Sequence, residues 1–536
     1  MVKHLRPNVE ISCLKKFIKF NVIPGSGLWH HFCMRKCLLI AVVLLSQMLT
    51  LSAFAEITSG ANGIKVPSPS KDQFLLTFNQ SSTGATNERY SHKVTDPDLN
   101  NPGRSLPHYL AVLPPCKNLS DVTCIESIES RKSGNLEWSK GTLSEQQLDV
   151  NKLDVSKVMN DWKYGTWPAD NVTSKNSALK ALPAGGVASS WELPATPNSD
   201  GNSYMAKVNF LDSLVGLGDG PTFSVNIEPW SWKCSTYRSC DYIGSPYGPR
   251  SVKFLENTEI RITIRVNFLS DRIGKWAIGR IKKPSISLQN EKLVIEGSMV
   301  SYPMGYALLK SREECAVKLS SALKTYYPLA GNLCLESRAS AISSDASDNA
   351  ALSYFEATGD QVIENAKIQE WSLTTIPIKN FSSECFKSNK FSMASSDAML
   401  YSNLPPVWDS SEGTLSYRIA STHVDSNGEL NKGNYSLAIP KPVADCLWKF
   451  DVSKGMASIV ITNPNGNQNV AITSLRTSND WVYFDASGFT FSSPEIKVKF
   501  SKSSSVKMIE IICVKGKNTK KVVGANPKCP AGFKKK

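Results

Sequence analysis

The chain has 536 residues, with 61 Lys and Arg against 47 Asp and Glu and a formal net charge of +14. This excess would suggest a nucleic-acid partner, but it is concentrated at the two ends of the chain. Residues 1–55 hold seven basic residues and one acid, and residues 515–536 hold eight lysines and no acid. The body between them has 46 basic and 46 acidic residues, so its composition argues against nucleic-acid binding.

The first predicted element is an export signal at residues 34–55. Its start, residues 34–36, carries Arg and Lys, an apolar run follows, and the segment ends in Ala53-Phe54-Ala55. This order is typical of a secretory signal peptide. The alternative is a transmembrane anchor, but Ser46 and Gln47 interrupt a run shorter than the ~20 apolar residues that a span needs. We expect cleavage after Ala55, translation from Met34, and no transmembrane span in the mature chain.

The ten cysteines that follow the leader predict a disulfide framework, because an even count in an exported chain is typical of cystines. Zinc is the alternative, but no Cys-x-x-Cys occurs and no His lies near these cysteines, so no metal site is expected. Closing short loops costs the least chain entropy, which favours pairing of neighbours, although sequence alone leaves the connectivity open. The expected pairs are Cys116–Cys124, Cys234–Cys240, Cys315–Cys334, Cys385–Cys446 and Cys513–Cys529.

Hydrophobic periodicity predicts a mainly β, multi-domain protein of antiparallel sheets or sandwiches. The clearest strand is Glu259–Phe268, where Ile, Val and Phe alternate with polar residues, as in a sheet with one face on a core and one in water. Strands are also expected at 222–227, and at 286–288 and 293–296 around a turn at Asn290.

The middle of the chain has a different pattern and predicts an α+β region. Helices are expected over Leu308–Leu323 and Ala350–Ala366, the second weakened by Gly359. Further on, Asn465-Gly466 between two strand patterns predicts a hairpin in a small sandwich of immunoglobulin-like dimensions.

These patterns predict several domains, because the 481 residues after Ala55 are too many for one ordinary core. In chain order they are a leader at 1–55, a flexible polar segment at 56–105 with one strand in Ser68–Phe78, a β-rich domain at 106–303, an α+β region at 304–440, a small β-sandwich-like domain at 441–505, and a basic disulfide-closed tail at 506–536.

Five strings carry a resemblance to known proteins: Asp121–Ile128, Ile278–Pro284, Ala444–Trp448, Ser487–Pro494 and Cys513–Lys536. Together they resemble large secreted or cell-surface proteins of actinobacteria, a group with no assigned activity. The resemblance covers the chain from about Cys116 onward. It implies export and a cell-envelope setting, and it supplies no catalytic residues.

Catalytic signals are weak, and no cofactor is predicted. Only three histidines follow the leader, and no nucleophile-elbow, zinc-protease or phosphate-loop motif occurs. His423 with Asp425 would orient a serine in a hydrolase, but a lone histidine at a strand end is more often structural. Carboxylate pairs for glycoside hydrolysis remain an alternative, because spacing in sequence does not give spacing in space.

Two sequence features indicate binding. Trp230 and Trp232 at i and i+2 predict a platform for stacking on a glycan, although core packing is the more common role of tryptophan. The basic tail predicts contact with an anionic envelope polymer or glycan, with a solubilising end as the alternative. Its candidate residues are Lys515, Lys517, Lys520, Lys521, Lys528, Lys534, Lys535 and Lys536.

The sequence therefore predicts a secreted or cell-surface protein with a binding or structural role. The alternatives are a secreted glycan-active hydrolase and an extracellular polymer-binding protein that uses the two tryptophans.

Overall fold

The computed structural model describes residues 56–58, 65–67, 69–78, 80, 92–94, 108–145, 147, 162–164, 185–213, 222–236, 239–243, 252–266, 276–323, 339–342, 350–376, 383–387, 392–402, 404–463, 466–469, 472–478, 480–491, 495–502, 509–516, 518–524, 529 and 532–536. The export signal predicted at 34–55 lies outside these residues. The chain divides at residue 57 into two compact units, and all features below except the start of the strand Glu56–Thr58 belong to the second unit, residues 58–536.

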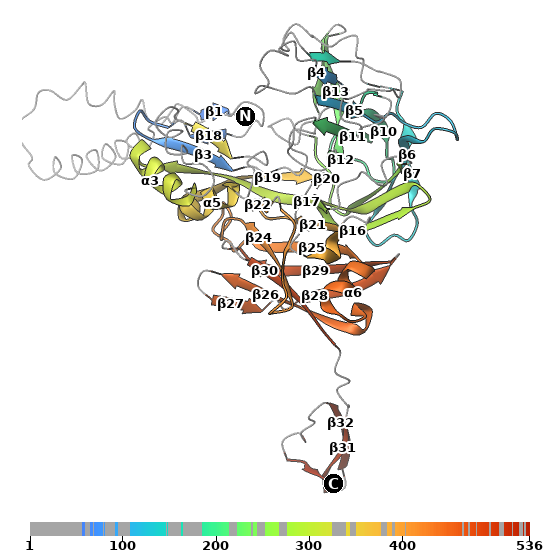
Figure 1. Ribbon diagram of the computed structural model, residues 1–536, viewed down its shortest axis with the longest axis vertical. Coiled ribbons are helices and arrows are strands. Elements are labelled where there is room, and N and C mark those ends of the chain that lie inside the picture. Colours follow the sequence, from blue (N-terminus) through green and yellow to red (C-terminus); the bar gives the residue numbers. More distant parts are fainter. Residues whose placement is uncertain are drawn as a thin grey trace, which may run out of the picture. The chain divides into compact units, whose positions relative to one another are not determined.

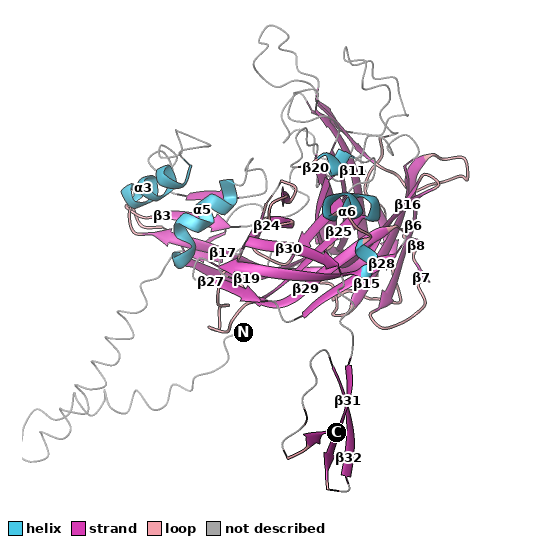
Figure 2. Cartoon of the chain, turned by 60° about the horizontal axis from the view of Figure 1, so that its bottom comes forward, coloured by secondary structure: helices cyan, strands magenta, loops and turns pink. Residues whose placement is uncertain are grey.

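Strands dominate this unit and helices are few, which confirms the predicted mainly β class (Figure 2). Within the described residues, no helix is both long enough and apolar enough to cross a membrane.

One antiparallel sheet carries the strand that the alternation predicted. It contains β6 (Thr123–Lys132), β15 (Thr258–Val266), β17 (Lys292–Leu309) and β16 (Trp276–Gln289), paired in that order. Figure 1 labels β6, β16 and β17 of this sheet. Along β15 the isoleucines at 260, 262 and 264 are fully buried, while Arg261 and Arg265 point outward. The predicted alternation is therefore confirmed for Thr258–Val266, and Phe268 lies outside the described residues.

The turn between β16 and β17 has a clear local cause. Asn290 and Glu291 both adopt positive φ values, 49° and 62°. Two such residues make the turn whose twist matches a β-hairpin, and asparagine tolerates this conformation better than most residues. The turn predicted around Asn290 is therefore confirmed.

A second sheet packs its apolar face against the first. At one edge, β10 (Ser189–Glu192) and β5 (His108–Val112) both pair with β11 (Ser203–Ser213). From β11 the sheet continues, each strand paired with the next, through β12 (Thr222–Pro229), β20 (Ser372–Ile376), the first part of β16, β21 (Ser392–Ser396), β25 (Lys432–Pro440), β29 (Trp481–Thr490) and β28 (Ile472–Ser478). The largest core cluster contains residues of both sheets, including Ile262, Phe210 and Trp371.

Two helices cover a smaller core at another part of the unit. Here α3 (Arg312–Leu323) and α5 (Ala350–Thr358) pack with β3 (Phe74–Phe78) and β17, and the rings of Phe78 and Phe355 lie 5.5 Å apart. The helix predicted to reach Ala366 ends at Thr358, because Gly359 begins a 3-10 turn and Val362-Ile363 begin β19 (Val362–Glu370). The strand predicted within Ser68–Phe78 is confirmed as β3, whose Phe and Leu side chains are buried.

The last third of the unit has the predicted sandwich character. A sheet of β24 (Thr414–Ala420), β30 (Glu495–Lys502), β26 (Gly455–Asn463) and β27 (Gly466–Asn469) shares a core with β25, β28, β29 and α6 (Lys441–Trp448). The pairing of β26 with β27 confirms the predicted hairpin.

Strand pairing crosses two of the predicted boundaries. β17 runs through residue 303, and β25 pairs with β29 across residue 440. The segments at 106–303, 304–440 and 441–505 are therefore joined by continuous sheets rather than separated by linkers.

Short elements complete the description. They are β1 (Glu56–Thr58), β2 (Lys65–Pro67), β4 (His92–Val94), β7 (Ser139–Lys140), β8 (Thr142–Leu143), β9 (Trp162–Tyr164), β13 (Ser231–Thr236), β14 (Ser239–Ile243), β18 (Ala339–Ile342), β22 (Leu400–Tyr401), β23 (Val407–Asp409), β31 (Ile509–Lys515), β32 (Asn518–Gly524), β33 (Lys534–Lys535) and the 3-10 turns Gly359–Gln361, Glu384–Lys387 and Val452–Lys454.

Candidate functional site

The C-terminal tail forms a small sheet, β32–β31–β33, closed by the Cys513–Cys529 disulfide. Opposite residues of an antiparallel pair share a face. The register places Lys520 of β32 and Lys535 of β33 on either side of Cys513 in the central strand. The disulfide and the sheet together therefore bring lysine positions of two separate segments, β32 and β33, alongside the central strand.

The described lysines of this C-terminal module, defined as residues 509–536, face solvent. Lys515, Lys534, Lys535 and Lys536 are all exposed, and none forms an ion pair with a described carboxylate. Glu510 is the one acid in the module's sequence. An exposed ammonium without a carboxylate partner keeps its full attraction for an external anion. Lys520 and Lys521 lie on β32, while Lys517 and Lys528 lie outside the described residues.

A second polar feature is a buried arginine that sequence reasoning missed. Arg280 of β16 is fully buried, and its guanidinium donates to the carbonyl oxygens of Ser396, Ala398, Gln80 and Met399 at 2.7, 2.5, 2.7 and 3.3 Å. Its Cζ lies 3.8 Å from the ring centroid of Tyr302. The cation is held by carbonyl dipoles and aromatic faces, so it joins three distant segments of the chain and has a structural role.

A hollow of about 270 Å³ lies beside this arginine, with Asp397 and Asn434 in its wall. The Asn434 backbone amide donates to Asp397 Oδ1 at 2.6 Å, and the Asn434 side-chain amide donates to Oδ2. Burial raises the pKa of Asp397 to about 6, against these hydrogen bonds. Among the described residues that line the hollow, Asp397 is the sole carboxylate. The hollow therefore lacks the facing pair of acids that glycoside hydrolysis uses.

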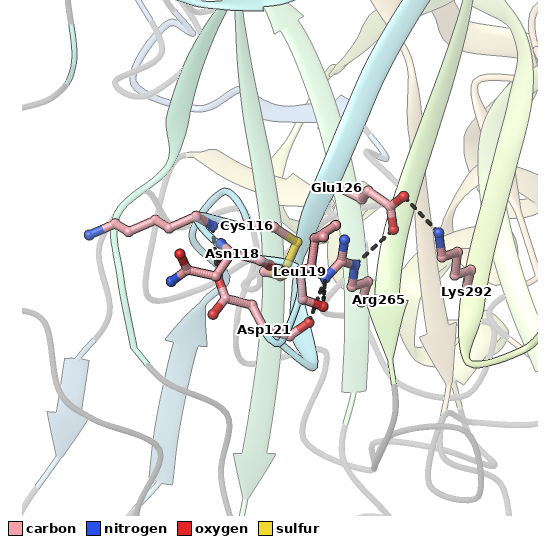
Figure 3. A network of polar contacts seen from close by, with 9 residues as sticks. Cys116, Asn118, Leu119, Asp121, Glu126, Arg265 and Lys292 are labelled. Atoms are coloured by element: carbon pink, nitrogen blue, oxygen red, sulfur yellow. Dashed lines mark hydrogen bonds and ion pairs between the residues drawn. A yellow bond between two sulfur atoms is a disulfide. The ribbon is translucent and has the colours of Figure 1, made fainter.

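The Cys116–Cys124 loop is fastened to the outer face of the first sheet (Figure 3). Arg265 donates through Nη1 to the carbonyls of Asn118, Leu119 and Asp121 at 3.1, 2.8 and 3.0 Å. Its Nε donates to Glu126 Oε2 at 2.8 Å, and Lys292 Nζ binds the other oxygen of Glu126 at 2.7 Å. This network fixes the loop as a rigid structural element.

Within that loop, the Asp121 carboxylate closes the turn. Its Oδ2 accepts hydrogen bonds from the backbone amides of Asn118 and Lys117, and these bonds hold the pKa of Asp121 below its usual range. The carboxylate is therefore engaged by its own loop.

The predicted tryptophan platform is not formed by Trp230. Its side chain is fully buried and its Nε1 donates to Ser190 Oγ at 2.9 Å. A ring without exposed surface has no face to offer to a sugar, so its stacking role is corrected to core packing. The side chain of Trp232 lies outside the described residues.

The alternative of a catalytic His423–Asp425 pair is not formed, in keeping with the structural role expected of this histidine. His423 Nδ1 contacts the carbonyl oxygen of Phe491 at 2.6 Å, while Asp425 Oδ1 accepts from the backbone amides of Asn427 and Glu429. The two side chains serve separate turns, so the arrangement does not orient a catalytic histidine.

Three of the five predicted disulfides are confirmed, Cys116–Cys124, Cys385–Cys446 and Cys513–Cys529. Cys315 is also disulfide-bonded, and Cys234 lies opposite Cys240 in the β13–β14 register. Cys334 and the side chains of Cys234 and Cys240 lie outside the described residues. The described residues contain no group of three or more His, Cys, Asp and Glu arranged to hold a metal ion.

Comparison with protein-family models gives no match, and neither does comparison with curated protein sequences. The resemblance to secreted actinobacterial proteins therefore stays a prediction.

Proposed function

We propose that this protein is exported and binds an anionic polymer of the cell envelope through its C-terminal module. The observation that carries the proposal is the exposure of Lys515, Lys534, Lys535 and Lys536 on a disulfide-closed sheet, with no carboxylate partner among the described residues. The body of the chain is formally neutral, so the net positive charge available to a partner is concentrated in this module.

The disulfides support the extracytoplasmic part of the proposal. Structural disulfides form and persist in oxidising compartments and are rare in the cytosol. The three described disulfides lie in separate parts of the chain, at Cys116–Cys124, Cys385–Cys446 and Cys513–Cys529. Cleavage after Ala55 would release the chain from Glu56, the first residue of β1.

The size of the charge is sufficient for attachment. A lysine near an anionic surface contributes on the order of 1 kcal/mol, and the attraction decays within about 8 Å at physiological ionic strength. With half of the eight lysines engaged, the total reaches about 4 kcal/mol. This attraction favours binding at low salt and release at high salt.

The first test removes the whole module. Because Glu510 lies inside β31, the chain should be shortened at Lys502, where β30 ends, rather than within the strand. The full chain from Glu56 and the shortened chain are incubated with isolated cell envelopes at low and high salt, and the bound fraction is measured after sedimentation. We expect the full chain to be retained at low salt only and the shortened chain to stay in solution.

A charge-matched control distinguishes binding through the C-terminal module from nonspecific electrostatic binding by lysines elsewhere on the chain. In the full chain, Lys71, Lys140 and Lys253 are exposed lysines of the body, and their joint replacement by Gln removes as much charge as replacing Lys534–Lys536. Only the second replacement should weaken retention. Equal retention of the full and shortened chains would reject the proposal.

A further inference from the structure

A hollow of about 310 Å³ opens on the outer face of the first sheet, where β16 and β17 meet. Trp138, Lys282, Lys283 and Arg476 are among the residues that line it. The guanidinium carbons of Arg131 and Arg261 each lie 4.2 Å from the ring centroid of Trp138, which fixes this wall. Its volume is at the lower end of the range for small-molecule sites.

The floor of the hollow is a β-bulge. Lys282 pairs with Ser298 and Ser285 pairs with Glu296, so Lys283 and Pro284 together oppose the single residue Gly297. Proline has no amide hydrogen for the ladder and is therefore placed at bulges in strands. Lys283 has φ 50°, a left-handed conformation that a lysine rarely adopts. Strain of this kind is found at functional sites, held there by the surrounding structure.

The surrounding structure does hold the bulge. A Cβ on Gly297 would lie 2.5 Å from Ile281 Cγ2 and 2.9 Å from the Lys282 carbonyl oxygen, so only glycine permits this approach. Trp371 Nε1 donates to the Gly297 carbonyl at 2.9 Å, and Arg476 donates to the Pro284 carbonyl. The bulge is thus fixed before any ligand arrives, which lowers the cost of binding.

The residues that line the hollow carry more positive than negative charge. Its two carboxylates are engaged, Glu259 with Arg131 at 2.7 Å and Glu296 with Arg261 at 2.8 Å. Lys282 and Lys283 are exposed and form no ion pair with any described residue. Three hydroxyls in the wall also make no hydrogen bond to a described group: those of Ser285, Ser298 and Ser478. The hollow is therefore lined by two lysines that have no ion-pair partner and three serines that have no hydrogen-bond partner among the described residues.

We propose that this hollow binds an acidic sugar unit, with its oxyanion held by Lys282 and Lys283 and its hydroxyls met by the three serines. An oxyanion satisfies ammonium donors through charge-assisted hydrogen bonds. The oxyanion is a carboxylate in a uronate and a sulfate in a sulfated sugar, and both present the same chemistry to the lysines. This site is separate from the C-terminal module and does not depend on its proposed role.

The test is calorimetric titration of the full chain from Glu56 with glucuronate, glucose 6-sulfate and glucose at constant ionic strength. We expect at least one of the two acidic sugars to bind saturably, and glucose to bind at least tenfold more weakly. Whichever acidic sugar binds more tightly identifies the source of the oxyanion. Failure of both acidic sugars to bind, or equal binding of glucose, would overturn the proposal.

Substitutions in the hollow then test whether the acidic sugar binds there. The change Lys283→Asn removes the charge and suits a left-handed backbone, so it should leave the bulge folded. Together with Lys282→Gln it should weaken acidic-sugar binding at least tenfold. The matched control is Lys449→Asn, because Lys449 is an exposed lysine with φ 61° outside the hollow. Unchanged binding in the double variant, or the same loss in Lys449→Asn, would refute the assignment.

Discussion

At the scale of single residues, the two buried ionisable groups Arg280 and Asp397 are held in different ways. Four carbonyl oxygens and an aromatic face replace water around the guanidinium of Arg280. Among the described residues, only the Asn434 amides donate to Asp397, and burial raises its pKa to about 6. No periodicity or motif marks either residue, since each owes its environment to segments remote in sequence.

The raised pKa of Asp397 predicts a pH dependence of stability. Between pH 3.8 and about 6 the folded chain binds more protons at this group than the unfolded chain does, so its contribution to stability falls as pH rises. The change Asp397→Asn removes a buried charge, so it should stabilise the protein at pH 7.5 by about 1–2 kcal/mol and have little effect near pH 4. Urea unfolding of both proteins across this range measures the difference, and parallel pH profiles would contradict the expectation.

At the scale of elements, local patterns predicted what depends on one strand or turn. The alternation of Glu259–Phe268 predicted the buried face of β15, and the Asn465-Gly466 signal predicted the β26–β27 hairpin. The bulge of β16 was not predicted, although Lys283-Pro284 carried a signal, because a proline inside a strand pattern points to an irregular ladder. Its partner Gly297 is recognisable only once the register of the two strands is known.

This bulge predicts a specific sensitivity at Gly297. The change Gly297→Ala places a Cβ 2.5 Å from Cγ2 of the fully buried Ile281 side chain and should destabilise the fold by about 2–4 kcal/mol. Gly134 is the matched control, since it has φ 95° and a methyl group added there would have no atom within 4 Å, so Gly134→Ala should cost about 1 kcal/mol. Thermal or urea unfolding measures both, and equal losses would show that the close approach at Gly297 has no energetic effect.

At the scale of the whole molecule, the fold class and the pairing of neighbouring cysteines were predictable, because both follow from composition and local closure. The domain organisation was not. β16 leaves one sheet to enter another, and β17 continues from β15 and β16 to β3 and β19. These strands join segments that differ in composition and were therefore predicted to be separate domains. No local sequence pattern shows that one strand belongs to two sheets.

The two candidate binding sites also differ in how far the sequence could predict them. The C-terminal module was predictable because its eight lysines and two cysteines are contiguous in sequence. The hollow at Lys282 and Lys283 was not, because its wall brings together β6, β15, β16, β17 and β28. The stacking prediction for Trp230 failed because the spacing of two tryptophans does not tell which side of a strand is buried.

The most direct test of the proposed polyanion binding is the salt dependence with which the full chain from Glu56 binds a defined polyanion that contains no sugar, inorganic polyphosphate. The logarithm of the binding constant should fall linearly with the logarithm of salt concentration, with a slope set by the number of ion pairs. Replacing Lys534, Lys535 and Lys536 by Gln should reduce that slope by roughly three-eighths if all eight lysines engage. Replacing Lys71, Lys140 and Lys253 should leave it unchanged. If both triple variants give the slope of the unmodified chain, the C-terminal module is not the binding element.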